Sequence, residues 1–202
     1  MTVAPLIVKI DLDGPQLPCL AEIREAAEQA VLIERKGAGP GSLTNDGLRY
    51  SVVDYEGCKK YAPTLVRWAE QTLPAIVSAL TGMALVLLDD PNAAVNINVL
   101  GGIGEKYELH TDSVPYTAIL FATGPHDGGE LMLAPYTDGP SYTEPVPGRL
   151  ILFEGDRLPH GVLPMKEDES RVSCPISMME VGARYERPTG VDRHLYASTE
   201  AA

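Results

Sequence analysis

Hydrophobic positions recur with helical spacing in the first part of the chain. Apolar residues stand at Leu20, Ile23, Ala27 and Val31, at intervals of three and four, while charged residues occupy the other faces. This is the period of an amphipathic helix, and it predicts a helix over residues 16–35.

A similar pattern predicts a second helix over residues 63–80, with one face formed by Leu65, Trp68, Thr72 and Ile76. Pro74 lies inside this segment and should kink the helix or split it, because proline lacks an N–H and clashes with the preceding turn. Gly82 is a suitable stop, since glycine accepts the left-handed backbone with which many helices end.

After residue 83 the pattern changes to short apolar runs separated by turn residues. The predicted strands span residues 84–88, 95–100, 107–112, 116–122, 130–134, 149–153, 160–163 and 171–179. Residues 48–55, between the two helices, also have the pattern of a strand. Strands this short and this closely spaced are typical of a sandwich or barrel. We therefore expect a mostly β fold of the α+β class, with an antiparallel β core flanked by N-terminal helices.

The chain of 202 residues has a suitable length for one domain. We expect residues 1–90 to form a helical support on the substrate side, residues 91–180 the β-barrel core, and residues 181–202 a tail. The turn-rich segment 135–148 is expected to be a loop that contributes to the substrate wall.

Acidic residues outnumber basic ones, 28 against 16, which gives a formal net charge of −12. Such a surface repels phosphate backbones and anionic lipid headgroups, so nucleic acid and membrane are disfavoured as partners. No apolar run approaches the roughly 18 residues of a membrane span, and the N-terminus lacks the pattern of a secretory signal. Cys19, Cys58 and Cys174 show neither zinc-site spacing nor a disulfide framework. We expect a cytoplasmic protein and leave its oligomeric state open.

His110 and Asp112 are candidates for a metal site. In a strand, residues i and i+2 point to the same face, so the predicted strand 107–112 presents an imidazole and a carboxylate side by side. His160, at the start of a later strand, is a candidate third ligand, since strands distant in sequence can be neighbours in a barrel. Two histidines and one carboxylate form the facial triad that leaves part of an Fe(II) ion open to substrate and oxygen. The alternative for so short a motif is a surface histidine beside a turn-forming aspartate.

Arg171 and Ser173 are again two residues apart and are expected to share one face, on the antiparallel partner of the strand that begins at His160. A guanidinium inside a barrel needs a carboxylate partner, because burying an unpaired charge is costly. A cation fixed near a metal suits a dicarboxylate cosubstrate that chelates the metal through its other end. The alternative is a salt bridge at the rim with an acidic residue of the turn 166–170.

Four further residues are weaker candidates. Asn96 and Asn98 share one face of their strand and either reach into the barrel or face solvent at an edge. His126 lies in a turn sequence, and His194 lies in the tail and is given no role.

Four segments, taken in order, resemble the catalytic core of the Fe(II)/2-oxoglutarate-dependent oxygenases, specifically the prolyl-4-hydroxylase-like branch. They are GIGEKYELHTD (102–112), GGELMLAP (128–135), PGRLILFEGDRLPHGVLPM (147–165) and SRVSCPIS (170–177). Family members show, in this order, a Gly and a Tyr before H-x-D, a G-G-x-L strand, a P-G-x-L-x-x-F strand, H-x-V-x-P and R-x-S. The resemblance covers less than half of the chain, and its specificity lies in the ordered set. It implies a double-stranded β-helix, or jelly-roll, core.

The resemblance implies that His110, Asp112 and His160 are the iron ligands. It also implies that Arg171 binds the distal carboxylate of 2-oxoglutarate, with Ser173 assisting. Fe(II), 2-oxoglutarate and O2 would then be the cofactor and cosubstrates.

The family pattern is matched or changed at three further positions. Tyr107 matches a position that lines the pocket in the family, although a cross-strand packing role is equally open. Leu100 stands where many relatives carry a tyrosine, so one cosubstrate contact is expected to be missing or supplied elsewhere. Asp112 keeps the carboxylate that halogenating relatives replace with a small residue, which argues against halogenation.

The function that the resemblance implies is that of a 2-oxoglutarate-dependent non-haem iron dioxygenase of the hydroxylase type. It would hydroxylate an unactivated C–H bond of a free amino acid or a small natural-product intermediate, with release of succinate and CO2, while desaturation and cyclisation stay open. The alternatives are a peptidyl (prolyl) hydroxylase and a non-oxygenase, cupin-like protein that binds a metal or small ligand. Arg171 argues against the cupin alternative, since a cupin needs no guanidinium there. A nucleic-acid demethylase is disfavoured by the net charge of −12.

Overall fold

The computed structural model describes residues 4–14, 17, 19–35, 42–43, 48–90, 92–125, 127–135 and 139–188. The helices in this part of the chain are α1 (Leu20–Ala27), α2 (Tyr55–Tyr61), α3 (Pro63–Gln71) and α4 (Leu73–Thr81). Its strands are β1 (Ile7–Asp11), β2 (Val31–Arg35), β3 (Leu48–Val53), β4 (Leu85–Leu87), β5 (Ile97–Leu100), β6 (Tyr107–His110), β7 (Tyr116–Phe121), β8 (Leu131–Leu133), β9 (Ser141–Thr143), β10 (Arg149–Glu154), β11 (His160–Val162) and β12 (Arg171–Glu180). His126 and His194 lie outside the described residues.

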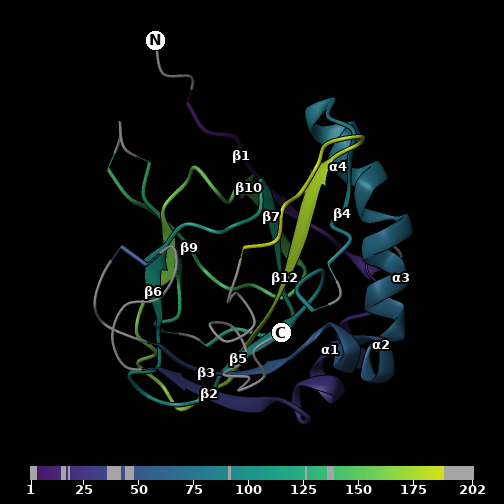
Figure 1. The fold of residues 1–202 in the computed structure, drawn as a ribbon. Helices are drawn as coiled ribbons and strands as arrows, with labels where there is room; N and C mark the ends of the chain where they lie inside the picture. The colour runs from purple at the N-terminus through teal and green to yellow at the C-terminus, as the bar shows by residue number, and fades with distance from the viewer. Residues whose placement is uncertain are drawn as a thin grey trace.

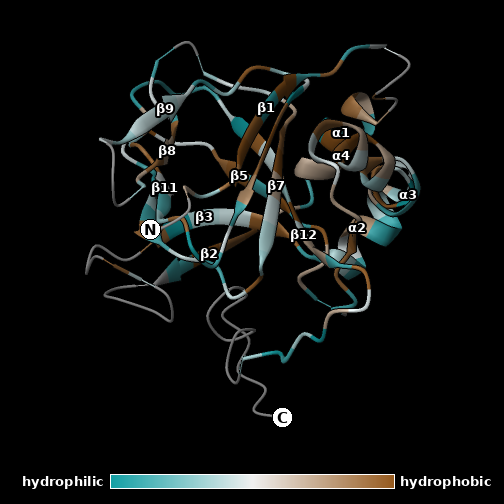
Figure 2. Cartoon of the chain, turned by 90° about the horizontal axis from the view of Figure 1, so that it is seen from above, coloured by the Kyte–Doolittle hydropathy of each residue, from teal (hydrophilic) through white to brown (hydrophobic). Residues whose placement is uncertain are grey.

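The strands form two antiparallel sheets. The larger has eight strands, in the order β1-β10-β7-β12-β5-β3-β2 with β4 paired to β12, and the smaller has the order β6-β11-β8-β9. The helices cover one face of the larger sheet, and the smaller sheet lies on its other side (Figure 1, Figure 2). The predicted antiparallel β core flanked by N-terminal helices is therefore confirmed.

The helix predicted over residues 16–35 is partly wrong. Only Leu20–Ala27 is helical, as α1, and Val31–Arg35 forms β2, which pairs with β3 in an antiparallel ladder. Val31 and Ile33 are β-branched and favour strands. The helical spacing of Val31 is a coincidence, because its side chain is 65% exposed and contributes nothing to the buried face of α1.

The second predicted helix is divided, as Pro74 led us to expect. Thr72 separates α3 from α4, and Pro74 lies in the first turn of α4, where its missing N–H costs no hydrogen bond. Gly82 ends α4 in the left-handed conformation, with φ of 73°, and its N–H donates to the carbonyl of Ser78 at 2.9 Å. The sequence pattern does not predict α2, which follows β3 directly.

The strands predicted between residues 84 and 179 are all present, with ends shifted by no more than two residues. The pattern misses β1 at the N-terminus and β9, which lies in the expected loop 135–148. Strands β1, β2 and β3 come from the first 90 residues and extend the larger sheet. The N-terminal segment therefore adds strands as well as helices to the core.

Side chains of β12 alternate between two environments. Those that pack in the main core, between the larger sheet and the helices, are Val172, Cys174, Ile176 and Met178. Those that line a cavity on the other side are Arg171, Ser173, Pro175 and Ser177. Because β12 lies in the middle of the larger sheet, one strand supports the core and the cavity at once.

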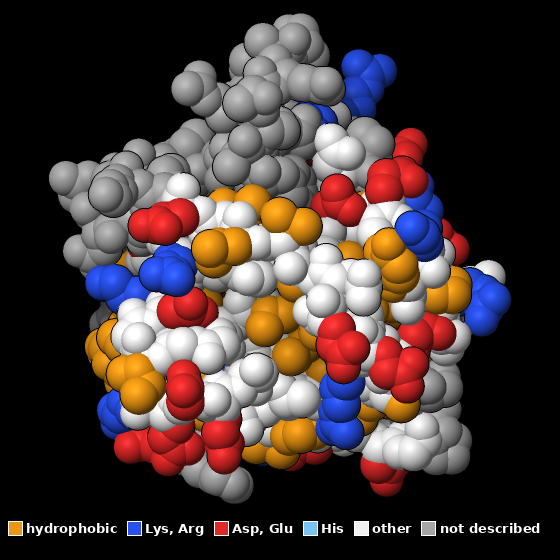
Figure 3. Space-filling view, turned by 90° about the horizontal axis from the view of Figure 1, so that it is seen from below, with side chains coloured by type: hydrophobic (Ala, Val, Ile, Leu, Met, Phe, Trp, Pro, Cys, Tyr) orange, Lys and Arg blue, Asp and Glu red, His pale blue; other side chains and the backbone are white. Residues whose placement is uncertain are grey.

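None of the described helices is long and apolar enough to cross a membrane. On the face seen from below in Figure 3, basic side chains are interspersed with acidic ones and are not gathered into a continuous tract. That arrangement agrees with the net charge of −12 and gives a phosphate backbone no extended basic surface on this face.

Candidate active site

A cavity of about 350 Å³ lies between the two sheets. The larger sheet contributes side chains from β3, β5, β7 and β12, and the smaller sheet contributes side chains from β6, β8 and β11. The ionisable side chains on its described walls are Tyr50, Tyr107, His110, Asp112, His160 and Arg171. The structure therefore brings the metal and cosubstrate residues predicted from the sequence into one cavity.

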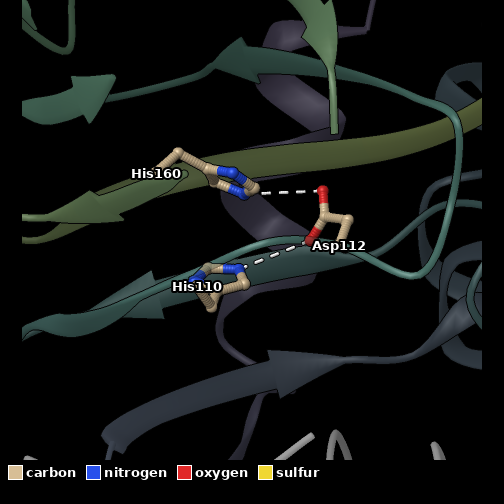
Figure 4. A group of neighbouring side chains, drawn as sticks. All are labelled: His110, Asp112 and His160. Atoms are coloured by element: carbon tan, nitrogen blue, oxygen red, sulfur yellow. Dashed lines mark ion pairs between the residues drawn. The ribbon is translucent and has the colours of Figure 1, made fainter. Parts of the chain in front are cut away.

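His110 and His160 lie opposite each other on neighbouring strands. His110 ends β6, His160 begins β11, and the two are direct partners in the antiparallel ladder, with ring centroids 4.3 Å apart. Asp112 lies between them, with Oδ1 3.4 Å from Nε2 of His110 and Oδ2 3.4 Å from Nε2 of His160. Figure 4 shows both imidazoles directed at this carboxylate. The three ligand atoms lie within 4.8 Å of one another, close enough to share one metal ion.

Asp112 reaches this position in a different way from the one predicted. β6 ends at His110, so Asp112 belongs to the turn that follows and not to the strand. Its N–H donates to the carbonyl of Gly155 at 2.9 Å, which fixes the turn against the end of β10. The turn, and not strand alternation, therefore places the carboxylate beside the two imidazoles.

Each imidazole is oriented by a backbone carbonyl two residues before it. Nδ1 of His110 contacts the carbonyl of Glu108 at 2.7 Å, and Nδ1 of His160 contacts the carbonyl of Leu158 at 2.9 Å. Because a carbonyl only accepts, Nδ1 carries the proton and donates, and Nε2 of the neutral ring keeps its lone pair for a metal. Phe153 also packs edge-on against His160, with centroids 4.6 Å apart. Contacts of this kind hold histidine ligands in position.

The Asp112 carboxylate has its own support, which sequence reasoning missed. Thr117 on β7 donates a hydrogen bond from Oγ1 to Oδ2 of Asp112. Gly155 packs against the same atoms, and a Cβ there would lie 2.5 Å from Oγ1 of Thr117 and 2.8 Å from Oδ2 of Asp112. The space beside the carboxylate therefore requires glycine. Gly155 is far from Asp112 in sequence and carries no reactive group, so no local motif could have indicated it.

The charges of the three residues are coupled. Burial raises the pKa of Asp112, but the charges and hydrogen bonds of His160 and His110 lower it by more, so its pKa lies well below the ordinary 3.8. Burial lowers the pKa of His160, but the charge and contact of Asp112 and the Leu158 carbonyl raise it by more, so its pKa lies above 6.5. An ionised carboxylate held between two imidazoles is a suitable donor set for a divalent cation.

Arg171 lies on a different strand pair from the one predicted. β12 pairs with β4, β5 and β7, whereas β11 pairs with β6 and β8. The chain therefore crosses from the smaller sheet to the larger one between β11 and β12. Arg171 and His160 consequently stand on opposite walls of the cavity.

The Arg171 side chain is 3% exposed and faces the cavity. Its Nε donates to the carbonyl of Gly129 at 2.8 Å, Nη1 donates to Oγ of Ser173 at 2.8 Å, and the guanidinium lies 5.0 Å from the centroid of the Phe121 ring. None of the described carboxylates pairs with it, which excludes a salt bridge with any acid of the turn 166–170 that the structure describes. Burial lowers the pKa of Arg171 to about 9, so the group stays cationic at neutral pH. A buried cation without a counter-charge is a binding site for an anion.

Two tyrosines stand near the histidines. Tyr107 lines the cavity, as predicted, with its ring 4.8 Å from that of His110 and 5.2 Å from that of Tyr50. Leu100 is buried opposite Arg171 in the β5–β12 ladder. Tyr50, on the neighbouring strand β3, also lines the cavity and was not predicted. A phenol therefore lies on the strand next to Leu100.

Asn96 and Asn98 reach into the cavity and do not face solvent at an edge. Asn98 stands opposite Ser173 in the β5–β12 ladder. Its Oδ1 is buried without a hydrogen-bond partner among the described residues. An orphaned acceptor on a cavity wall is a position where a ligand donor can bind.

Residues 95–176 match the family model described as the 2OG-Fe(II) oxygenase superfamily. No curated protein sequence matches the chain. The matched residues include all three members of the His110, Asp112 and His160 cluster, together with Arg171.

Several solved structures have a similar fold. The epimerase SnoN in complex with Fe3+, alpha ketoglutarate and nogalamycin RO has a TM-score of 0.67 and 19% identity, over 97% of this chain and 87% of that one. The carbocyclase SnoK from nogalamycin biosynthesis has a TM-score of 0.66 and 17% identity, over 96% and 86%. A Pseudomonas putida prolyl-4-hydroxylase has a TM-score of 0.55 and 20% identity, over 86% and 92%. These similarities confirm the double-stranded β-helix fold expected from the sequence.

Proposed function

We propose that the chain is a dioxygenase of the 2OG-Fe(II) oxygenase superfamily, whose family model residues 95–176 match, and that it hydroxylates an unactivated C–H bond of a small molecule. Its cofactor and cosubstrate are Fe(II) and 2-oxoglutarate. The substrate classes that the sequence favours are a free amino acid and a natural-product intermediate. The observation that carries this proposal is the pairing, in one cavity, of a two-histidine, one-carboxylate cluster with a buried arginine that lacks a counter-charge.

The cluster fits Fe(II) by its donor chemistry. His110 and His160 each turn Nε2 towards the Asp112 carboxylate, because their Nδ1 atoms are engaged by backbone carbonyls. Two imidazole nitrogens and one carboxylate oxygen are the protein ligands of the facial triad. His110, Asp112 and His160 would therefore hold the iron, and Thr117 would keep the carboxylate in place through its hydrogen bond.

The opposite wall fits a dicarboxylate. Arg171 would bind the distal carboxylate of 2-oxoglutarate, and Ser173 would assist, because the Arg171 Nη1 hydrogen bond to Ser173 keeps the guanidinium facing the cavity. The Phe121 ring beneath the guanidinium and the Gly129 carbonyl hold its plane. Bound Fe(II) and 2-oxoglutarate would supply oxidation by O2, with succinate and CO2 as by-products.

The remaining walls position the substrate and exclude water. Tyr107 packs beside His110, and hydrophobic side chains such as Leu131 and Val162 line the same part of the cavity. A dry, shaped cavity around the metal directs oxidation to one bond of the bound molecule. A non-oxygenase, cupin-like protein would have no use for a buried cation facing its metal site.

The test is an anaerobic titration of the metal-free protein with Fe(II) and 2-oxoglutarate, followed by the weak visible charge-transfer band of the iron chelate. We expect the band with the wild type, no band with His110→Ala, and a band that needs far more 2-oxoglutarate with Arg171→Ala. Arg149→Ala is the matched control, since Arg149 pairs with Asp11 on β1, outside the cavity. Absence of the band in wild-type protein that has bound iron would exclude the cosubstrate and the proposed function.

Product analysis tests the hydroxylase type separately. Hydroxylation adds one oxygen atom to the substrate, epimerisation leaves its mass unchanged, and cyclisation removes two hydrogen atoms. Mass spectrometry of the reaction product therefore decides between a hydroxylase and the reaction types named for SnoN and SnoK.

A further inference from the structure

Few charged side chains line the cavity. Among the described lining residues, Arg171 is the one lysine or arginine, and Asp112 is the one aspartate or glutamate. The proposed function assigns both of these, Asp112 to iron and Arg171 to 2-oxoglutarate. No charged side chain of these described walls is then left for the substrate.

Arg187 and Asp90 lie just outside the cavity and pair with each other. Arg187 precedes Pro188, which lines the cavity, and its Nε lies 2.8 Å from Oδ2 of the fully buried Asp90 side chain. Oδ1 of Asp90 in turn accepts from the N–H groups of Asn92 and Ala93, at 2.9 Å each. This network fixes the C-terminal segment beside the cavity and neutralises the cation that it brings there.

Two neutral polar groups on the cavity wall, which the proposed function assigns to neither iron nor 2-oxoglutarate, offer hydrogen-bond acceptors. Asn98 Oδ1 is buried with no hydrogen-bond partner among the described residues. Ser177 donates its hydroxyl proton to the carbonyl of Ala93 at 2.9 Å, so its oxygen is left to accept. Both residues come from β5 and β12 on the same wall. Acceptors of this kind match hydroxyl or N–H donors of an uncharged ligand.

We infer that the substrate places an uncharged part that bears hydroxyl or N–H donors in this cavity, and that it is not a free amino acid. A free amino acid carries a carboxylate and an ammonium group, and burying either without a counter-charge is strongly unfavourable. A neutral part can instead satisfy Asn98 and Ser177 with its own donors while it packs on Val114, Pro175 and Pro188. This inference rests on the proposed function, because it needs Arg171 and Asp112 to be occupied.

The experiment uses pairs of small molecules that differ chiefly in charge. The closest pairs are hydroxylated aromatic acids with their primary amides, which match them in size, and free amino acids with their N-acetyl methylamides form a second set in which size also changes. Dissociation constants are measured anaerobically on the protein loaded with Fe(II) and 2-oxoglutarate, from the shift of the charge-transfer band and from equilibrium dialysis. We expect the neutral member of each binding pair to bind at least about tenfold more tightly than the charged one.

A variant with one added cation sharpens the result. Ser177→Lys places an ammonium group on the substrate wall, and we expect it to shift the preference towards the carboxylate members. Ser141→Lys is the matched control, because Ser141 is exposed on β9 and does not line the cavity. It should keep the wild-type preference.

Two results would overturn the inference: a charged member that binds as tightly as its neutral partner, or a panel in which no neutral member binds. Failure of the proposed function is recognised separately, by absence of the band with Fe(II) and 2-oxoglutarate. In that case dialysis with Arg171→Met, which lacks the lining cation, still shows whether the cavity prefers neutral ligands.

Discussion

On β12, the side chains that face the helices and the first two that line the cavity are buried to a similar degree. Val172 is 4% exposed and Ile176 is fully buried, while Arg171 and Ser173 on the other face are each 3% exposed. The two faces differ in what surrounds the buried groups. The helix side is an apolar core, whereas the cavity side holds a cation without a counter-charge. Burial therefore does not distinguish a structural residue from a functional one here, but the lack of a partner does.

Removing the metal carboxylate should have the largest effect on the cavity side. Asp112→Ala deletes one of three ligands, so Fe(II) should bind more weakly by more than the roughly 100-fold that loss of an outer-shell partner costs. Equilibrium dialysis with Fe(II) under anaerobic conditions measures this. Asp127→Ala, which removes an exposed carboxylate paired with Lys166, should bind iron as the wild type does.

Shortening a helix-side residue should affect stability and leave the chemistry unchanged. Ile176→Ala removes fully buried methyl groups, so we expect the free energy of unfolding to fall by about 2–5 kcal/mol. Urea unfolding gives this value. The affinity of the folded variant for 2-oxoglutarate should stay within about twofold of wild type, and a tenfold change would show that the two faces are coupled.

Filling the space beside the metal carboxylate should have an intermediate effect. Gly155→Ala places a methyl group against Thr117 and Asp112, so the carboxylate must move. We expect Fe(II) affinity to fall about tenfold, which is typical when a residue that supports a metal ligand is changed. Gly139→Ala is the control, since a Cβ at Gly139 meets nothing within 4 Å. Equal iron affinity in both variants would contradict this role of Gly155.

The smallest expected effects are two pH dependences of opposite sign, one in the stability of the metal-free protein and one in its Fe(II) affinity. The pKa of His160 is raised above 6.5, so its ion pair with Asp112 stabilises the metal-free protein at low pH, and this stability is lost as the pH rises through the raised pKa. Iron binding needs the neutral ring, so Fe(II) affinity should rise over the same range. Thermal unfolding of metal-free protein and Fe(II) dialysis over a common pH series check both slopes. A stability and an Fe(II) affinity that change in the same direction with pH would contradict the assignment of His160 as an iron ligand that pairs with Asp112.

The sequence predicted which residues form the site better than it predicted how the strands bring them together. Most of the ionisable groups in the cavity could be predicted from the H-x-D motif, His160 and the R-x-S motif, because their chemistry is visible in the residue types, but Tyr50 could not. The cross-strand pairing of His110 with His160 depends on strand register, which no local pattern specifies. The placement of Arg171 on the opposite sheet depends on where the chain crosses between sheets, and for the same reason its predicted strand pairing was wrong.

The fold shows the same difference between features that a local pattern predicts and features that depend on long-range contacts. Turn residues and short apolar runs located the strands after residue 83, and Pro74 located the break between α3 and α4. The segment Val31–Arg35 was misassigned because an accidental helical spacing of apolar residues outweighed their β-branched side chains. Thr117 and Gly155 were missed because their roles come from contacts with Asp112 that exist only after folding.

The most direct test of the contrast between the two faces compares neighbouring residues of β12. The dissociation constant of 2-oxoglutarate is measured anaerobically on the Fe(II) forms of the wild type, Arg171→Ala and Val172→Ala. We predict that Arg171→Ala weakens binding about 10- to 100-fold through loss of charge-assisted hydrogen bonds. Val172→Ala should lower stability by about 1–3 kcal/mol and leave the dissociation constant unchanged. Equal dissociation constants in all three proteins would contradict the assignment of the cavity face to the cosubstrate.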